Sequence, residues 1–176
     1  MADVFISVGS NLNDRHGNIR WALDIMTSFF RLDDISSLYE TEPWGWKHQG
    51  WFINAVITGG FREDPLELLK LLKDVESRMG RTVGIQNAPR PIDLDIIVFE
   101  KLIVSTNELT IPHPRVTERK FVLLPLKDVL PDFIHPESGK HIDQLIRECP
   151  DQSMIYRIGH LWRKDDGGVP DESRPC

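Results

Sequence analysis

The sequence has little cysteine and no long apolar segment. Its 176 residues include two cysteines, Cys149 and Cys176, which excludes a disulfide framework and fits a reducing compartment. Apolar stretches such as residues 121–126 fall far short of the roughly 20 residues that span a bilayer. The chain starts with an early acid and no basic region, which argues against a signal peptide. We therefore expect a cytoplasmic protein that is not bound to a membrane.

Basic residues are also fewer than acidic ones: 21 Lys and Arg stand against 27 Asp and Glu, which gives a formal net charge of −6. This balance argues against bulk binding of nucleic acid, although it leaves room for a small basic site. The sequence contains neither a P-loop nor a Gly-x-Gly-x-x-Gly turn, so a nucleotide would have to be held in another way. The histidines show no zinc-ligand spacing.

Apolar periodicity predicts strand, helix, strand, strand, helix and strand, in that order. The expected elements cover residues 4–8, 19–30, 35–39, 51–58, 65–79 and 91–99. Asp14 and Asp64 are expected helix caps, Gly80 is an expected helix stop, and Gly59 with Gly60 is expected to end the fourth element. This order is typical of the ferredoxin-like (βαββαβ) plan, an α+β fold with helices packed on one face of an antiparallel sheet.

The remaining chain predicts smaller elements. Residues 102–104 and 108–111 suit a small extra hairpin, and residues 121–130 and 142–147 suit short C-terminal helices. The end of the chain is polar and rich in Gly, Pro and Asp. We expect a single domain over residues 1–160 and a disordered tail over residues 161–176.

The most specific local feature is the pair Asp93 and Asp95. Residues two apart on a strand point to the same side, so two carboxylates share one face. The other face is predicted to be apolar through Ile92, Leu94, Ile96 and Val98, with Ile97 and Phe99 following the carboxylates. Neighbouring carboxylates repel each other, and a bound cation offsets this repulsion. Mg²⁺ is a common choice because it prefers oxygen ligands. Two solvated acids on an exposed sheet face are the alternative.

Several cations accompany the acids: Arg81, Arg90, His113 and Arg119. Acids that hold a metal, together with cations that neutralise phosphate, are the residue types that phosphoryl transfer requires. Each cation taken alone is also compatible with an ordinary surface charge.

A third feature combines aromatic and amide side chains. Phe52 and Asn54 lie on one side of their predicted strand, where a flat heterocycle would stack on the ring and pair with the amide. Phe121 is a candidate for the opposite side of such a ligand. Phe52 and Phe121 would otherwise be core residues. Trp44 lies in a predicted loop with exposed aromatics, which suggests that the loop covers something.

Together these residues resemble the 6-hydroxymethyl-7,8-dihydropterin pyrophosphokinase family of the folate pathway, from about residue 4 to about residue 145. The most specific motif is Pro-Arg-Pro-Ile-Asp-Leu-Asp at residues 89–95, followed by Pro-His at residues 112–113. Gly-Ser-Asn-Leu at residues 9–12, Phe-Ile-Asn-Ala at residues 52–55 and Arg-Lys-Phe-Val-Leu at residues 119–123 extend the likeness.

The resemblance implies a transferase, an ATP-dependent kinase that moves a pyrophosphoryl group to a pterin hydroxymethyl group and releases AMP. It implies ATP as co-substrate and two Mg²⁺ ions held by Asp93 and Asp95. It implies catalytic roles for Asp93, Asp95, Arg81 and Arg90. The implied pterin contacts are Thr41, Glu42, Trp44, Phe52, Asn54 and Phe121, and the implied ATP contacts are Glu76, Arg81, Arg90, Thr110, His113 and Arg119.

The chain departs from the family pattern in the loop at residues 82–88, which has no cation where the family often has several. We expect activity to survive with altered ATP affinity or loop dynamics. Two alternatives remain: a Mg²⁺-dependent phosphoryl or nucleotidyl transferase acting on another small substrate, and a non-catalytic ligand-binding module. We expect small-molecule partners only, no nucleic acid and a monomer.

Overall fold

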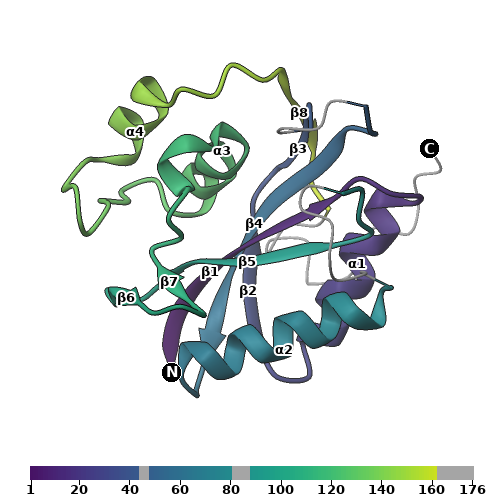
Figure 1. Cartoon of the computed structure of the whole chain (residues 1–176), viewed down its shortest axis with the longest axis horizontal. Coiled ribbons are helices and arrows are strands. Elements are labelled where there is room, and N and C mark those ends of the chain that lie inside the picture. Colours follow the sequence, from purple (N-terminus) through teal and green to yellow (C-terminus); the bar gives the residue numbers. More distant parts are fainter. Residues whose placement is uncertain (44–47, 81–87, 162–176) are drawn as a thin grey trace.

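The computed structural model describes residues 1–43, 48–80 and 88–161, which form an α+β fold around an antiparallel sheet (Figure 1). The strands are β1 (Ala2–Ser10), β2 (Arg31–Ile35), β3 (Leu38–Thr41), β4 (Phe52–Phe61), β5 (Asp93–Phe99), β6 (Val104–Ser105), β7 (Thr110–Ile111) and β8 (Ile155–Gly159). The helices are α1 (Arg15–Met26), α2 (Pro65–Arg78), α3 (Lys120–Val129), α4 (Ile142–Glu148) and a 3-10 turn at Val116–Glu118. The expected α+β class and antiparallel sheet are confirmed. No helix among the described residues is both long and apolar enough to cross a membrane.

The main sheet is built around β1 and β4. Its strand order is β5-β1-β4-β3-β8, and β2 also pairs with β4. The expected strand at residues 35–39 is divided between β2 and β3, because the chain breaks from the ladder at Ser36. There the Ser36 hydroxyl accepts from the Val56 amide at 2.9 Å. The predicted hairpin is present as β6 paired with β7.

Both long helices begin at their predicted caps and α2 ends at its predicted stop, whereas α1 ends at Met26, before Phe29 and Phe30 of the predicted stripe. The Asp14 side chain accepts from the Gly17 amide at 3.0 Å, and the Asp64 side chain accepts from the Leu66 amide at 2.9 Å. Gly80 follows α2 with a φ of 82°, a conformation that costs glycine little. These local interactions fix the helix ends independently of the rest of the fold.

Helices cover both faces of the sheet (Figure 1). On one face α1 and α2 pack against the side chains of Val4, Ile6 and Val8. On the other, α3 and α4 pack against Phe5 and Val56. The expectation of helices on one face therefore holds for α1 and α2 only. The second, smaller core comes from helices that follow the central sheet in the sequence.

The sequence prediction was wrong about the end of β4. The strand does not stop at Gly59 and Gly60 but continues to Phe61. A Cβ atom at Gly59 would lie 2.0 Å from the Arg31 carbonyl oxygen and 2.4 Å from the Phe30 ring. Glycine is needed there because the neighbouring segment at Phe30 and Arg31 approaches closely, not because the chain turns.

The sequence prediction was also wrong about which face of the sheet the last two residues of β5 occupy. The register between β1 and β5 shifts between Phe5 and Ile6, which places a bulge near Ile97. Val98 therefore joins the core under α3 and α4, and Phe99 joins the core under α1 and α2, opposite to the simple alternation. Strand β8 was missed because most of its residues are exposed, so its sequence carries no buried stripe.

Candidate active site

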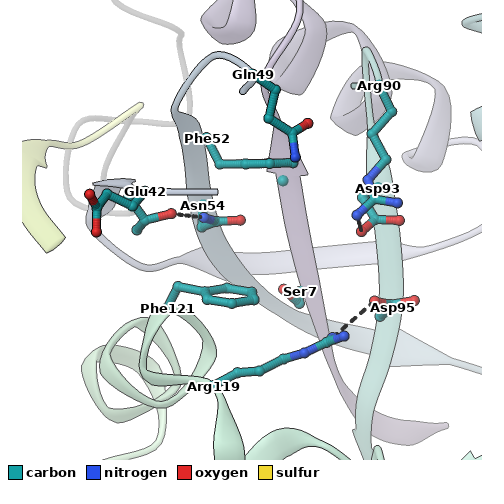
Figure 2. A pocket seen from close by; sticks show the side chains of 12 residues that line it. Ser7, Glu42, Gln49, Phe52, Asn54, Arg90, Asp93, Asp95, Arg119 and Phe121 are labelled. Atoms are coloured by element: carbon teal, nitrogen blue, oxygen red, sulfur yellow. Dashed lines mark hydrogen bonds and ion pairs between the residues drawn. The ribbon is translucent and has the colours of Figure 1, made fainter. Parts of the chain in front are cut away.

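A pocket opens at the end of the sheet that α3 and α4 leave uncovered (Figure 2). Strands β1, β4 and β5 form its floor, and the start of α3 forms one wall. The lining residues are Ser7, Gly9, Thr41, Glu42, Gln49, Phe52, Asn54, Arg90, Asp93, Asp95, Arg119 and Phe121. Nine of these twelve are residues that the sequence singled out, so the fold brings separate motifs into one cavity.

Two aromatic rings and an amide form one end of the pocket. Phe52 and Phe121 lie on either side of Asn54 in Figure 2. The Asn54 amide nitrogen donates to the Thr41 hydroxyl at 2.7 Å, and both side chains are buried. This bond fixes the carboxamide and leaves its oxygen free to accept from a ligand.

Gly9 provides the room for this arrangement. A Cβ atom at Gly9 would lie 2.6 Å from the Asn54 Oδ1 atom and 3.7 Å from the Phe52 ring. The missing side chain keeps the floor of the slot open beneath the amide. The slot suits a flat, polar-edged heterocycle that stacks between the rings.

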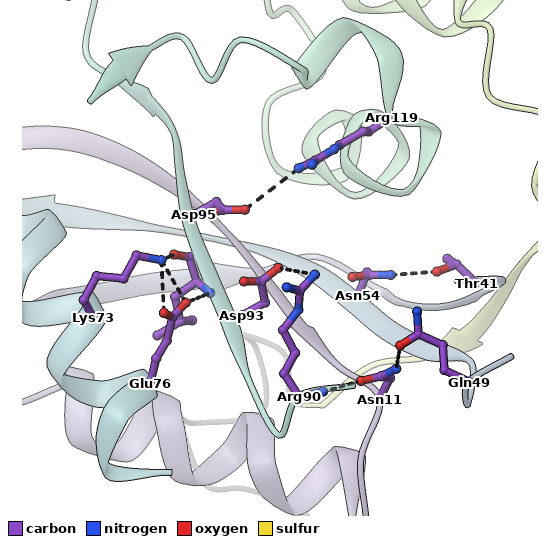
Figure 3. A network of polar contacts seen from close by, with 11 residues as sticks. Asn11, Thr41, Gln49, Asn54, Lys73, Glu76, Arg90, Asp93, Asp95 and Arg119 are labelled. Carbon is purple, nitrogen blue, oxygen red and sulfur yellow. Dashed lines mark hydrogen bonds and ion pairs between the residues drawn. The ribbon is translucent and has the colours of Figure 1, made fainter. Parts of the chain in front are cut away.

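Two aspartate–arginine pairs form the other end (Figure 3). The Arg90 guanidinium lies 3.2 Å from the Asp93 carboxylate, and that of Arg119 lies 3.9 Å from the Asp95 carboxylate. Burial lowers the pKa of Arg119, and the Asp95 charge opposes this shift. The carboxylates are thus balanced by cations from two other segments.

Each arginine also contacts one of the two aromatic rings. The Arg90 guanidinium carbon lies 5.7 Å from the centre of the Phe52 ring, and that of Arg119 lies 5.7 Å from the centre of the Phe121 ring. The Nε atom of each arginine is buried without a hydrogen-bond partner among the described residues. An unpaired buried donor is costly, and a hydrogen bond to an anionic ligand would offset that cost.

Comparison with known proteins agrees with this geometry. The family model for 7,8-dihydro-6-hydroxymethylpterin-pyrophosphokinase matches residues 5–131. The chain belongs to this family. The 2-amino-4-hydroxy-6-hydroxymethyldihydropteridine pyrophosphokinase of Porphyromonas gingivalis is 41% identical over 146 residues, covering 78% of this chain and 97% of that protein. The protein of the same name from Aquifex aeolicus is 37% identical over 136 residues, 77% of this chain and 85% of the relative.

Some relatives in the family are much longer. The chain is 38% identical to the folic acid synthesis protein fol1 of Schizosaccharomyces pombe over 85% of its own length, but spans only 21% of that protein. A crystal structure of wild-type Plasmodium falciparum HPPK-DHPS matches with a TM-score of 0.66 at 16% identity, over 84% of this chain and 44% of that one. At that identity the likeness shows the fold alone.

The pocket residues fit a magnesium ion that a phosphate ligand helps to hold. Among the described residues no group of three or more Asp, Glu, His or Cys side chains gathers to form a complete metal cage. Asp93 and Asp95 instead offer two carboxylates on one strand face. One or two carboxylates plus substrate phosphates is the usual donor set for Mg²⁺.

Three residues implied by the family resemblance lie outside this pocket. The Glu76 carboxylate is buried and accepts from the Leu94 amide at 2.7 Å and from Lys73 Nζ at 3.0 Å (Figure 3). Glu76 therefore ties α2 to β5. Thr110 lies in β7. The role of each in ATP binding remains a prediction.

His113 is the third of these residues. Its Nδ1 atom accepts from the Arg115 amide at 3.1 Å, and burial lowers its pKa. Burial thus favours the neutral imidazole, and because Nδ1 accepts a hydrogen bond, the proton of that form lies on Nε2, which can donate.

The remaining differences concern residues that were missed or that lie outside the described ranges. Ser7, Gly9 and Gln49 line the pocket but were not predicted as site residues. Ser7 interrupts the apolar residues of the first strand, which was an available signal; Gln49 lies in a loop and gave none. Trp44, Arg81 and residues 82–87 of the uncharged loop lie outside the described residues.

Proposed function

We propose that this chain transfers the pyrophosphoryl group of ATP to the hydroxymethyl group of 6-hydroxymethyl-7,8-dihydropterin and releases AMP, a step of folate biosynthesis. The observation that carries this proposal is the continuity of the pocket, in which an aromatic slot ends directly at two carboxylates with arginine partners. Family membership supports the same reaction.

The pterin would occupy the aromatic slot. Phe52 and Phe121 would stack on its two faces, and Asn54, oriented by Thr41, would pair with its polar edge. Glu42 lines the slot beside them, and Trp44 is proposed to help. A ring held in this way points one end toward Asp95, where the hydroxymethyl group would meet the phosphate.

The triphosphate would bind beside the carboxylates. Asp93 and Asp95 would hold Mg²⁺, which neutralises phosphate charge and favours in-line displacement. Arg90 and Arg119 would turn their unpaired donors to phosphate oxygens. The other proposed ATP contacts are Glu76, Arg81, Thr110 and His113.

The proposed transfer forms a bond from the hydroxymethyl oxygen to the β-phosphorus of ATP. The bond between that phosphorus and the oxygen bridging to the α-phosphorus breaks, and AMP leaves with its electron pair. We assign the hydroxyl proton to Asp95, the carboxylate at the end of the slot. Because the residues mainly position and neutralise the reactants, most of the acceleration is attributed to orientation and electrostatics.

Three finer points belong to the same proposal. The binding of two Mg²⁺ ions is supported by the two carboxylates, Asp93 and Asp95, that share one face of β5 in the pocket. A ferredoxin-like classification is supported by the order β5-β1-β4 followed by β2 and β3. A cytoplasmic location is supported by the free, buried thiol of Cys149.

Product analysis tests the function. The protein is mixed with ATP, Mg²⁺ and 6-hydroxymethyl-7,8-dihydropterin, and nucleotides and pterins are separated by ion-pair chromatography. We expect AMP only when pterin is present, matched by an equal amount of pterin diphosphate. ADP would indicate an ordinary phosphoryl transferase, and binding of both ligands without a nucleotide product would indicate a binding module.

A further inference from the structure

Strand β1 loses side-chain volume as it enters the pocket. The residues that face α3 and α4 are Phe5 in the core, then Ser7, then Gly9. Their neighbours Ile6 and Val8 are buried on the opposite face. Ser7 is therefore the last residue of the pocket floor on this strand that has a side chain.

The Ser7 side chain opens to the pocket, and its hydroxyl is not used by the described part of the protein. The residue is 8% exposed, and its side chain makes no hydrogen bond with any described residue. Other buried serines differ: the Ser10 hydroxyl accepts from Asn18 at 3.2 Å, and the Ser37 hydroxyl accepts from Arg157 at 2.7 Å. Since no described residue bonds the Ser7 hydroxyl, it is available to donate a hydrogen bond to a ligand in the pocket.

Ser7 lies where the aromatic slot meets the carboxylates. In the strand register it is opposite Val56 on β4 and opposite Asp95 on β5. Its hydroxyl lies between Phe121 and Asp95 in Figure 2. Neighbouring strands are about 4.8 Å apart, so a ligand group that reaches Asp95 over this floor passes within reach of Ser7.

We propose that the Ser7 hydroxyl positions the acceptor group of the pterin by donating a hydrogen bond to its hydroxymethyl oxygen. This inference rests on the proposed function. The donation would use one lone pair of that oxygen, leaving the other for the β-phosphorus and the hydroxyl proton for Asp95. Ser7 would thus select pterins that carry a 6-hydroxymethyl group and hold the nucleophile in line.

The test separates a contact with the hydroxymethyl group from a role in shaping the floor. Titration calorimetry, with Mg²⁺ and a non-hydrolysable ATP analogue present, compares 6-hydroxymethylpterin with 6-methylpterin, which lacks the oxygen. We expect Ser7→Ala to weaken binding of 6-hydroxymethylpterin by about 3- to 10-fold and binding of 6-methylpterin by less than about 2-fold. The turnover number should also fall, and the melting temperature should stay level or rise.

Ser37→Ala is the matched control, because Ser37 does not line the pocket and its buried hydroxyl accepts a hydrogen bond from Arg157. It should lower the melting temperature by about 3 °C or more while leaving the ratio of the two pterin affinities unchanged.

Two results would overturn the role of Ser7 alone. Equal weakening of both pterins would mean that Ser7 only shapes the floor, and unchanged affinities would mean that the hydroxyl makes no contact. Failure of the unaltered protein to bind either pterin would overturn the proposed function together with this inference.

Discussion

The two faces of the sheet are made from the same strands but serve different purposes. The face under α1 and α2 is mostly apolar, with Ile6, Ile53 and Leu94 fully buried. The opposite face is apolar only under α3 and α4 and then becomes a pocket. Because side chains alternate between the two faces of a strand, successive residues contribute in turn to the stable core and to the pocket.

On the second face the change from core to site follows the rows of the register. Phe5 lies between Thr58 and Val98, Ser7 lies between Val56 and Asp95, and Gly9 lies between Asn54 and Asp93. Over the five residues from Phe5 to Gly9, the partner strands supply first no carboxylate or amide, then one carboxylate, then a carboxylate and an amide. The pocket thus continues the core along β1, where the side chains become smaller and their neighbours more polar.

The largest predicted effect contrasts neighbours on β5 that face opposite ways. Asp95→Asn should reduce turnover roughly 100- to 1,000-fold with an unchanged circular dichroism spectrum, because it removes a charge from the reacting end of the pocket. Leu94→Ala should instead lower the free energy of unfolding by about 2–5 kcal/mol by leaving a cavity, while the folded fraction stays active. Undiminished AMP release by Asp95→Asn would contradict the catalytic assignment.

The second prediction contrasts one glycine from each face. Gly59→Ala should cost about 3 kcal/mol in urea unfolding, because its Cβ would meet the Arg31 carbonyl oxygen in fixed backbone. Gly9→Ala should cost less than about 1 kcal/mol, because the clash is with the movable end of the Asn54 side chain. The displaced amide should weaken pterin binding. A larger loss of stability for Gly9→Ala than for Gly59→Ala would show that the two faces do not divide stability and ligand binding in this way.

A third prediction concerns selectivity within the pocket. Asn54→Ala should weaken pterin binding by about 10- to 100-fold and ATP binding by less than about 2-fold, because the lost amide leaves polar atoms of the ring edge unpaired. Calorimetry with each ligand separately measures both effects. Equal losses of pterin and ATP affinity would mean that Asn54 does not act on the pterin alone.

The smallest predicted effect concerns the attachment of α3 to its face. The Tyr39 hydroxyl donates to Asp128 of α3 at 3.1 Å, and burial followed by the Asp128 charge raises the pKa of Tyr39 to about 12. An unfolded tyrosine ionises near pH 10. The folded state therefore holds this proton more tightly, and the resulting stability is present below pH 10 and is lost as the pH rises to about 12.

Tyr39→Phe should lower the free energy of unfolding by about 1 kcal/mol at pH 8 and flatten its decline between pH 10 and pH 12. Urea unfolding at several pH values measures this. An unchanged slope would assign the alkaline loss of stability to other groups.

Local chemistry in the sequence determined much of this protein. The caps Asp14 and Asp64, the buried stripes of α1 and α2, and the shared face of Asp93 and Asp95 depend on neighbours a few residues away. The same short-range motifs carried the family resemblance and nine of the pocket's residues. Such features can be predicted because their partners are close in the chain.

Tertiary structure decided the features that depend on distant partners. The extension of β4 through Gly59 depends on Arg31, and the reversed facing of Val98 and Phe99 depends on how β5 registers with β1. Strand β8 exists because β3 offers it an edge. Ser7 presents an unpaired hydroxyl to the pocket beside Asp95 only after β1 is placed next to β5, since no local pattern specifies which strands become neighbours.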